Sequence, residues 1–133
     1  MREILFRGKR VDNGEWVEGN YVHRTKFYGD PDDKHFILVG GEFDYDFYDA
    51  FEVDPETVGQ YIGIKDRNGK KIFELDIISH VKFPDEPALI CWHENGFAIK
   101  GLWYSTDILS RKADIEVVGN IHDNPELIGG EKR

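Results

Sequence analysis

The chain alternates short apolar runs with turn residues, and this spacing predicts strands rather than helices. Three Asn-Gly pairs separate the runs, within VDNGEW at 11–16, DRNGKK at 66–71 and HENGFA at 93–98. Asn and Gly tolerate the positive φ angles of the tightest hairpin turns, and such a pair between apolar segments is a strong hairpin signal. Three pairs in 133 residues therefore predict a mainly β fold.

The flanks of the first and third pairs predict two hairpins. Ile4, Phe6 and Val11 outline a strand interrupted near Gly8, and the N-terminal hairpin returns through residues 16–22. The second hairpin covers residues 88–103 and begins with the unbroken apolar run ALICW, which is typical of a well-buried strand. This second hairpin is the expected core of the domain.

The remaining apolar segments complete a small β domain. Residues 57–64, 76–83 and 115–121 are rich in β-branched and aromatic residues and are predicted as strands. Helix is scarce, with short segments expected near 106–112 and at 124–128, where Pro125 follows a capping Asn124. We expect an N-terminal hairpin plus a small bent sheet or SH3-like partial barrel. It forms one domain over residues 1–128, with a flexible tail at 129–133.

The formal charge of -9 is concentrated in one segment. Residues 29–56 hold ten acids and a single base, Lys34, whereas the rest of the chain holds 16 acids and 16 bases and is neutral. The ten acids are Asp30, Asp32, Asp33, Glu42, Asp44, Asp46, Asp49, Glu52, Asp54 and Glu56. The protein is thus a neutral domain that carries one acidic segment.

Aromatic residues interleave with these acids in GGEFDYDFYDAFEVD, residues 40–54. Aromatic side chains often anchor protein interfaces, so this stretch is a candidate docking surface for a basic partner, either a host protein or a neighbouring copy. The alternative is an edge strand whose charged outer face discourages edge-to-edge pairing. The candidate docking residues are Phe43, Asp44, Tyr45, Asp46, Phe47, Tyr48 and Asp49.

Nothing in the sequence indicates a membrane or export segment. No apolar run approaches the roughly 20 residues that span a bilayer, and the N-terminus lacks the apolar stretch of a signal peptide. Cys91 is the only cysteine, so no intramolecular disulfide can form, and its apolar surroundings predict a buried, inert thiol. We expect a cytoplasmic protein.

Motifs for catalysis, metals and phosphate are weak throughout. The stretch GIKDRNGK at 63–70 has one residue too many between its glycines for a phosphate loop and precedes a strand-like run, so a corner between strands is favoured. Cys91, His93, His80 and His122 show no zinc-ligand spacing. Ser79 and His80 are adjacent in a predicted strand and point to opposite faces. No catalytic, metal or cofactor site is therefore predicted.

Two carboxylates close to that corner have a structural interpretation. Glu74 and Asp76 lie two residues apart before a predicted strand, so they could share one face. We expect them to accept hydrogen bonds from turn amides or to pair with Lys70 or Lys71.

Nucleic-acid binding is the alternative function. FRGKR at 6–10 and KDRNGKK at 65–71 are basic clusters, and aromatic residues could stack bases. The acidic pI of about 5.0 argues against this function, because nucleic-acid binders usually present a basic face. The aromatic candidates are Trp16, Trp92, Trp103 and Tyr104.

Three separated blocks resemble the YopX family of phage and prophage proteins. They are REILFRGKRVDNGEW at 2–16, VDPETVGQYIGIKDRNGKKIFELDII at 53–78 and VVGNIHDNPELI at 117–128. Members of that family usually carry Glu-Gly-Asp where this chain has Glu74-Leu75-Asp76. A glycine there would indicate a positive φ angle, so Leu75 has either an ordinary or a strained backbone. The resemblance implies a phage-encoded protein and no established activity.

Together, these patterns predict a non-enzymatic phage or prophage accessory protein that acts in the host cytoplasm through protein contacts. We expect it to be a homo-oligomer without a cofactor. The alternative is a nucleic-acid-associated protein of phage DNA metabolism.

Overall fold

The computed structural model describes residues 4–24, 33–40, 48–81, 83–93, 96–100 and 114–128. Within these ranges the chain is mainly β, as predicted, with two antiparallel sheets, two short 3-10 helices and no closed barrel. The chain divides into two compact units, residues 1–60 and 61–133, and the division falls within one strand. A single domain over 1–128 stays a prediction. The two units are described in turn.

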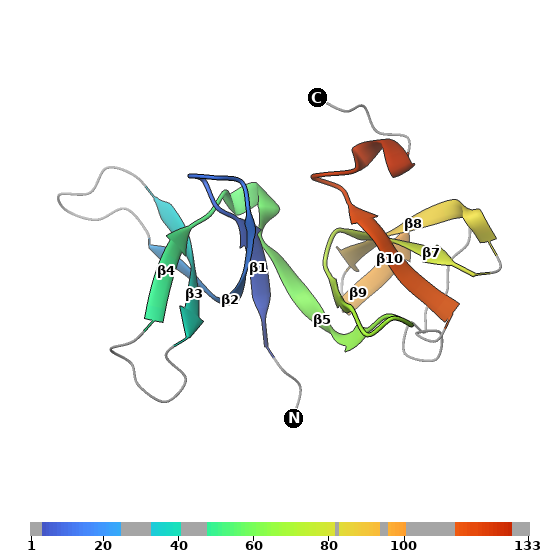
Figure 1. Ribbon diagram of the computed structural model, residues 1–133, viewed down its shortest axis with the longest axis horizontal. Helices are drawn as coiled ribbons and strands as arrows, with labels where there is room; N and C mark the ends of the chain where they lie inside the picture. Colours follow the sequence, from blue (N-terminus) through green and yellow to red (C-terminus); the bar gives the residue numbers. More distant parts are fainter. Residues whose placement is uncertain are drawn as a thin grey trace. The chain divides into compact units, whose positions relative to one another are not determined.

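The first unit is an antiparallel sheet with the strand order β4-β3-β2-β1-β5 (Figure 1). Its elements are β1 (Phe6–Lys9), β2 (Trp16–Arg24), β3 (Lys34–Gly40), β4 (Tyr48–Glu52), the 3-10 helix η1 (Pro55–Thr57) and the start of β5 (Gly59–Lys65). The turn signals do not predict β3, which has polar neighbours on both sides. Ile37 of β3 and Val53 after β4 are almost fully buried and form the core of this unit.

The predicted N-terminal hairpin is confirmed, but the predicted interruption at Gly8 is wrong. β1 and β2 pair from Phe6↔Gly19 to Lys9↔Trp16, and Gly14 in the connecting turn has a φ of 73°. Gly8 pairs with Val17 inside a continuous strand. A Cβ atom at Gly8 would lie 3.0 Å from the Val53 Cβ, so glycine is present because Val53 packs against the backbone there.

The second unit contains β6, which pairs with β5, and a four-stranded sheet with the order β10-β7-β8-β9 (Figure 1). Its elements are β6 (Lys71–Phe73), β7 (Asp76–His80), β8 (Phe83–His93), β9 (Gly96–Lys100), β10 (Ile115–Asn120) and the 3-10 helix η3 (Pro125–Ile128). The core is rich in isoleucine and consists of Ile64, Ile72, Ile78, Ala88, Ile90 and Ile115.

The structure confirms the predicted strands of this unit with small changes at their ends. The hairpin expected over 88–103 forms between β8 and β9, which pair from Leu89↔Lys100 to His93↔Gly96. The strand expected over 76–83 ends at His80. The helix expected at 124–128 is the 3-10 helix η3, whereas the segment 106–112 lies outside the described residues.

The second Asn-Gly pair forms the turn between β5 and β6, as the corner interpretation predicts. Gly69 has a φ of 81°, and the Asp66 carbonyl accepts from its amide at 3.0 Å. One carboxylate oxygen of Asp66 accepts from the amides of Asn68 and Lys70 at 2.8 and 2.9 Å. The other oxygen accepts from the Val117 amide of β10 at 2.9 Å. The side chain of Asp66 therefore joins the turn to the sheet.

The next turn contains Leu75, whose φ of 70° is the only positive value at a non-glycine position among the described residues. The backbone here is therefore strained, as one of the two alternatives proposed. The Leu75 amide donates to the Ile90 carbonyl at 2.7 Å, and its carbonyl accepts from the Ile121 amide at 3.0 Å. Asp76 accepts from the Phe73 amide at 2.8 Å, which confirms its expected structural role. Hydrogen bonds on both sides hold Leu75 in this conformation.

Replacing Leu75 tests this strain. Leu75→Gly and Leu75→Ala both remove the half-buried side chain, but only glycine adopts a positive φ without a Cβ clash. We expect Leu75→Gly to be more stable than Leu75→Ala by about 1 kcal/mol, because a left-handed non-glycine residue costs roughly that much. Urea unfolding followed by circular dichroism measures the difference. Equal stability of the two variants would contradict strain at this position.

The pH dependence of stability tests the role of Asp66. Burial raises the pKa of Asp66, but hydrogen bonds from the Val117, Lys70 and Asn68 amides and the charge of Lys70 outweigh it, so the pKa is lowered. A carboxylate whose pKa is lowered on folding stabilises the folded state at pH values above its unfolded pKa of about 3.9. This contribution is lost as the pH falls through the pKa of the folded state. We expect Asp66→Asn to lower the free energy of unfolding by about 2 kcal/mol at pH 7.

The difference in unfolding free energy between wild type and Asp66→Asn should shrink as the pH falls below about 4, because Asp66 is then protonated. Asp85→Asn is the control, because Asp85 is an exposed carboxylate of the same unit and its replacement should change stability little. A difference that stays constant from pH 7 to pH 3 would show that the Asp66 charge contributes nothing.

Candidate functional site

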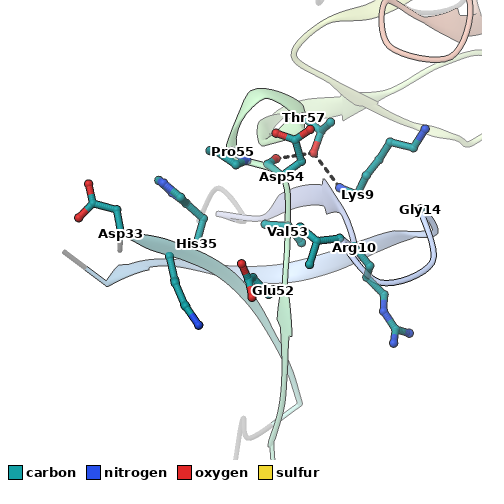
Figure 2. A pocket seen from close by; sticks show the side chains of 12 residues that line it. Lys9, Arg10, Gly14, Asp33, His35, Glu52, Val53, Asp54, Pro55 and Thr57 are labelled. Carbon is teal, nitrogen blue, oxygen red and sulfur yellow. Dashed lines mark hydrogen bonds between the residues drawn. The ribbon is translucent and has the colours of Figure 1, made fainter. Parts of the chain in front are cut away.

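The first unit contains a pocket of about 680 Å³ between the β1–β2 turn, the start of β3 and the segment from β4 to η1 (Figure 2). Three parts of the chain that are distant in sequence supply its lining, so no local motif marks it. Its lining includes the side chains of Arg10, His35, Glu52, Val53, Asp54 and Thr57.

Backbone hydrogen bonds between the end of β1 and the end of β4 fix one wall of the pocket. Arg10 and Val53 form an antiparallel bridge. On either side of it, the Val11 amide donates to the Glu52 carbonyl at 3.0 Å and the Asp54 amide donates to the Lys9 carbonyl at 2.9 Å. These contacts hold the segment after β4 against β1.

Thr57 joins η1 to the same wall through hydrogen bonds of its hydroxyl group. Its hydroxyl accepts from the Lys9 amide at 2.8 Å and donates to the Asp54 carbonyl at 2.6 Å, as the dashed lines in Figure 2 show. The Asp54 carboxylate caps η1 by accepting from the Glu56 amide at 3.0 Å, and Pro55 occupies the first turn, where its missing amide hydrogen costs nothing. The rim of the pocket is therefore a rigid polar turn.

Arg10, the arginine that lines the pocket, contacts Asp12 and Phe51. Arg10 contacts Asp12 through two hydrogen bonds of 2.9 and 2.6 Å, and this pairing raises the pKa of Arg10 and lowers the pKa of Asp12. Its guanidinium also lies 4.5 Å from the centre of the Phe51 ring. Arg10 thus covers an aromatic residue of β4 rather than pointing an unpaired charge into the pocket.

A row of aromatic and imidazole rings crosses β2 and β3 next to the pocket. His23 and His35 face each other across the strands and stack with their ring centres 4.1 Å apart. The Tyr21 hydroxyl lies 2.5 Å from His35 Nδ1, and burial raises the pKa of Tyr21. Asp33 lies 3.8 Å from His23 Nε2. Within the row, the Tyr21 hydroxyl and His35 Nδ1 form a hydrogen bond, whereas the two imidazole rings are in contact through their faces.

Sequence reasoning missed this row, although part of the signal was present. Tyr21 lies in the strand predicted over residues 16–22, whereas His23 lies just beyond its predicted end, and the two share a face only because β2 continues to Arg24. Their neighbour His35 comes from β3, and only the register between β2 and β3 brings it opposite His23.

The predicted docking residues are only partly described. Residues 43–47 lie outside the described residues, and Tyr48 is described by its backbone alone. Asp49 is exposed on β4, which is the edge strand of its sheet. The segment 40–54 therefore contains an edge strand, and docking through it stays a prediction.

The side chains weighed for metal binding or catalysis do not come together. In the described ranges, no three His, Cys, Asp or Glu residues lie close enough to hold a metal ion. His80 is fully buried, with its Nε2 3.9 Å from Asp114. Cys91 is half-buried, so the expectation of a buried thiol is wrong. On β8 the side chains of Ala88 and Ile90 point to the buried face, and the side chain of Cys91 points to the other face.

The basic cluster at 6–10 is largely used inside the fold. Arg7 is buried, with its guanidinium 4.6 Å from the Trp16 ring, and the Lys9 ammonium lies 5.6 Å from the same ring. Trp16 therefore stacks on the protein's own cations, which disfavours it as a platform for bases. The side chains of Trp92, Trp103 and Tyr104 lie outside those described.

Among the described residues, no helix is long and apolar enough to cross a membrane. The comparison with curated proteins gives no match. Among solved structures, the chain is similar to protein EF1440 from Enterococcus faecalis, with 21% sequence identity and a TM-score of 0.56. The similarity covers 96% of this chain and 99% of that one, and it shows a shared fold.

The family comparison agrees with the three sequence blocks. The YopX protein family matches residues 5–129, which is nearly the whole chain. The blocks that carry the resemblance include the wall of the pocket at 53–57, the Asp66 turn and the end of β10. The chain belongs to the YopX family.

Proposed function

We propose that this YopX protein is a non-enzymatic accessory protein of a phage or prophage. It acts in the host cytoplasm through protein contacts and as a homo-oligomer. The observation that supports this proposal is the distribution of charge, because residues 29–56 carry nine more acids than bases whereas the rest of the chain is neutral. Such a concentration attracts a basic partner and repels acidic ones, including nucleic acid.

The described part of the acidic segment is suited to contact a partner. It contains β3, β4 and η1 of the first unit, and its exposed acids include Asp49, Glu52, Asp54 and Glu56. Hydrogen bonds to β1 and to His35 anchor the backbone at Val53 and Asp54. The acids thus lie on rigid elements, which lowers the entropy lost on binding.

The candidate docking surface consists of Phe43, Asp44, Tyr45, Asp46, Phe47, Tyr48 and Asp49. Alternating acids and aromatic residues would combine electrostatic attraction with apolar anchors. The alternative of nucleic-acid binding is weaker, because the basic side chains contact other residues of the protein. Arg7 and Lys9 lie over the Trp16 ring, and Arg10 forms an ion pair with Asp12.

Affinity capture from host lysate tests the proposal. The triple variant Asp44→Asn, Asp46→Asn, Asp49→Asn should capture at least about tenfold less partner than wild type, because charges at the rim of an interface steer binding. The control is Glu15→Gln, Asp85→Asn, Glu126→Gln, which removes the same charge elsewhere and should capture as wild type does.

Two outcomes would contradict the proposal. One is equal capture by both triple variants. The other is salt-sensitive binding of DNA or RNA by the wild type in a shift assay, which would favour the alternative function. A monomeric mass in solution at tens of micromolar protein would contradict the homo-oligomer.

A further inference from the structure

The register of β4 shows which of its backbone groups point away from the sheet. The Val53 amide donates to the His35 carbonyl at 2.9 Å, and this pair continues the register in which Phe51 faces Ile37. In an antiparallel pair, residues that exchange hydrogen bonds alternate with residues that do not. Odd-numbered residues of β4 therefore bond to β3, and Ala50 directs both its N–H and its C=O away from β3.

Glu52 confirms this direction and marks the end of the open edge. Its carbonyl accepts from the Val11 amide of the first hairpin, on the side of β4 opposite β3. Beyond it, the Arg10–Val53 bridge occupies the edge. Before it, no strand in the described ranges pairs with the outer side of β4 (Figure 1). The Ala50 N–H, the Ala50 C=O and the Glu52 N–H lie on this open edge.

The side chains beside the open edge favour one kind of occupant. Asp49, Ala50 and Glu52 are exposed, and the small Ala50 side chain lets another strand approach. Two copies of β4 pairing edge to edge would bring their acids together, which disfavours a second copy of this strand. A segment that carries Lys or Arg at alternate positions would instead place its cations near Asp49 or Glu52.

We propose that the outer edge of β4 takes an extended, basic segment of a partner protein as an additional strand. The backbone hydrogen bonds come from the Ala50 N–H and C=O and from the Glu52 N–H. Glu52 on one face of the strand, or Asp49 on the other, selects for positive charge. This inference rests on the proposed function, namely contact with a protein partner, and it specifies the conformation and charge of that partner.

The test uses three blocked octapeptides and isothermal titration calorimetry at low salt. Acetyl-TKTKTKTK-amide can form a basic strand, acetyl-PKPKPKPK-amide has the same charge but cannot complete a strand ladder, and acetyl-TETETETE-amide reverses the charge. We expect the Thr-Lys peptide to bind wild type at least about tenfold more tightly than either control, because each added backbone hydrogen bond contributes to affinity.

Ala50→Pro removes one outward N–H without removing a bond to β3, since proline is tolerated on the open side of an edge strand. It should weaken binding of the Thr-Lys peptide about tenfold and leave the weak Pro-Lys binding unchanged. Glu52→Lys keeps every backbone group and should shift preference from the Thr-Lys to the Thr-Glu peptide. Glu126→Lys makes the same charge change on η3 and should leave the preference unchanged.

Several results would overturn the inference. They are equal binding of the Thr-Lys and Pro-Lys peptides, no effect of Ala50→Pro in a variant that circular dichroism shows to be folded, or no binding of the Thr-Lys peptide. A wild-type dimer that Ala50→Pro dissociates would identify a second copy as the occupant. If lysate capture depends on Asp44, Asp46 and Asp49 but not on Ala50→Pro, the proposed function stands and this inference fails.

Discussion

The second unit depends on the hydrogen bonds that the Asp66 carboxylate accepts from backbone amides. This carboxylate shapes the β5–β6 turn through the Asn68 and Lys70 amides and joins that turn to β10 through Val117. The Arg67 amide adds a bond to the Ile115 carbonyl next to it. Because Ile115 belongs to the isoleucine core, the turn and the core are fixed by the same few contacts. One ionised side chain thus links a local turn to long-range packing.

Local signals in the sequence were sufficient for most of the strands and for two of the turns. The Asn-Gly pairs at 13–14 and 68–69 predicted turns whose glycines have positive φ, and apolar segments predicted β5, β7, β8, β9 and β10. Features set by long-range packing were missed. Gly8 looked like a strand break, because nothing near it in sequence shows that Val53 packs against it. β3 was also missed, although it contains the apolar run at residues 36–39.

The candidate site was less predictable than the fold, because its geometry depends on which residues of neighbouring strands lie opposite each other. Acidity and aromatic content marked the segment around β4 from sequence alone. The outward direction of Ala50, however, follows from the pairing of β4 with β3, and the His23–His35 stack follows from the pairing of β2 with β3. The pocket requires the bridge between Arg10 and Val53. A periodic pattern indicates which residues share a face, but not which strand will lie beside them.

The residues that identify the family are different from those proposed to act. Within the blocks that resemble YopX proteins, Thr57 holds η1 and Asp66 holds the β5–β6 turn. Asn120 holds the turn after β10 by accepting from the amides of His122 and Asp123. These side chains stabilise turns of the fold, and a fold does not by itself specify an activity. Most of the acidic segment lies between the first two blocks, and its strand β4 contributes an exposed edge. The proposed docking edge of β4 therefore lies outside the blocks that carry the family resemblance.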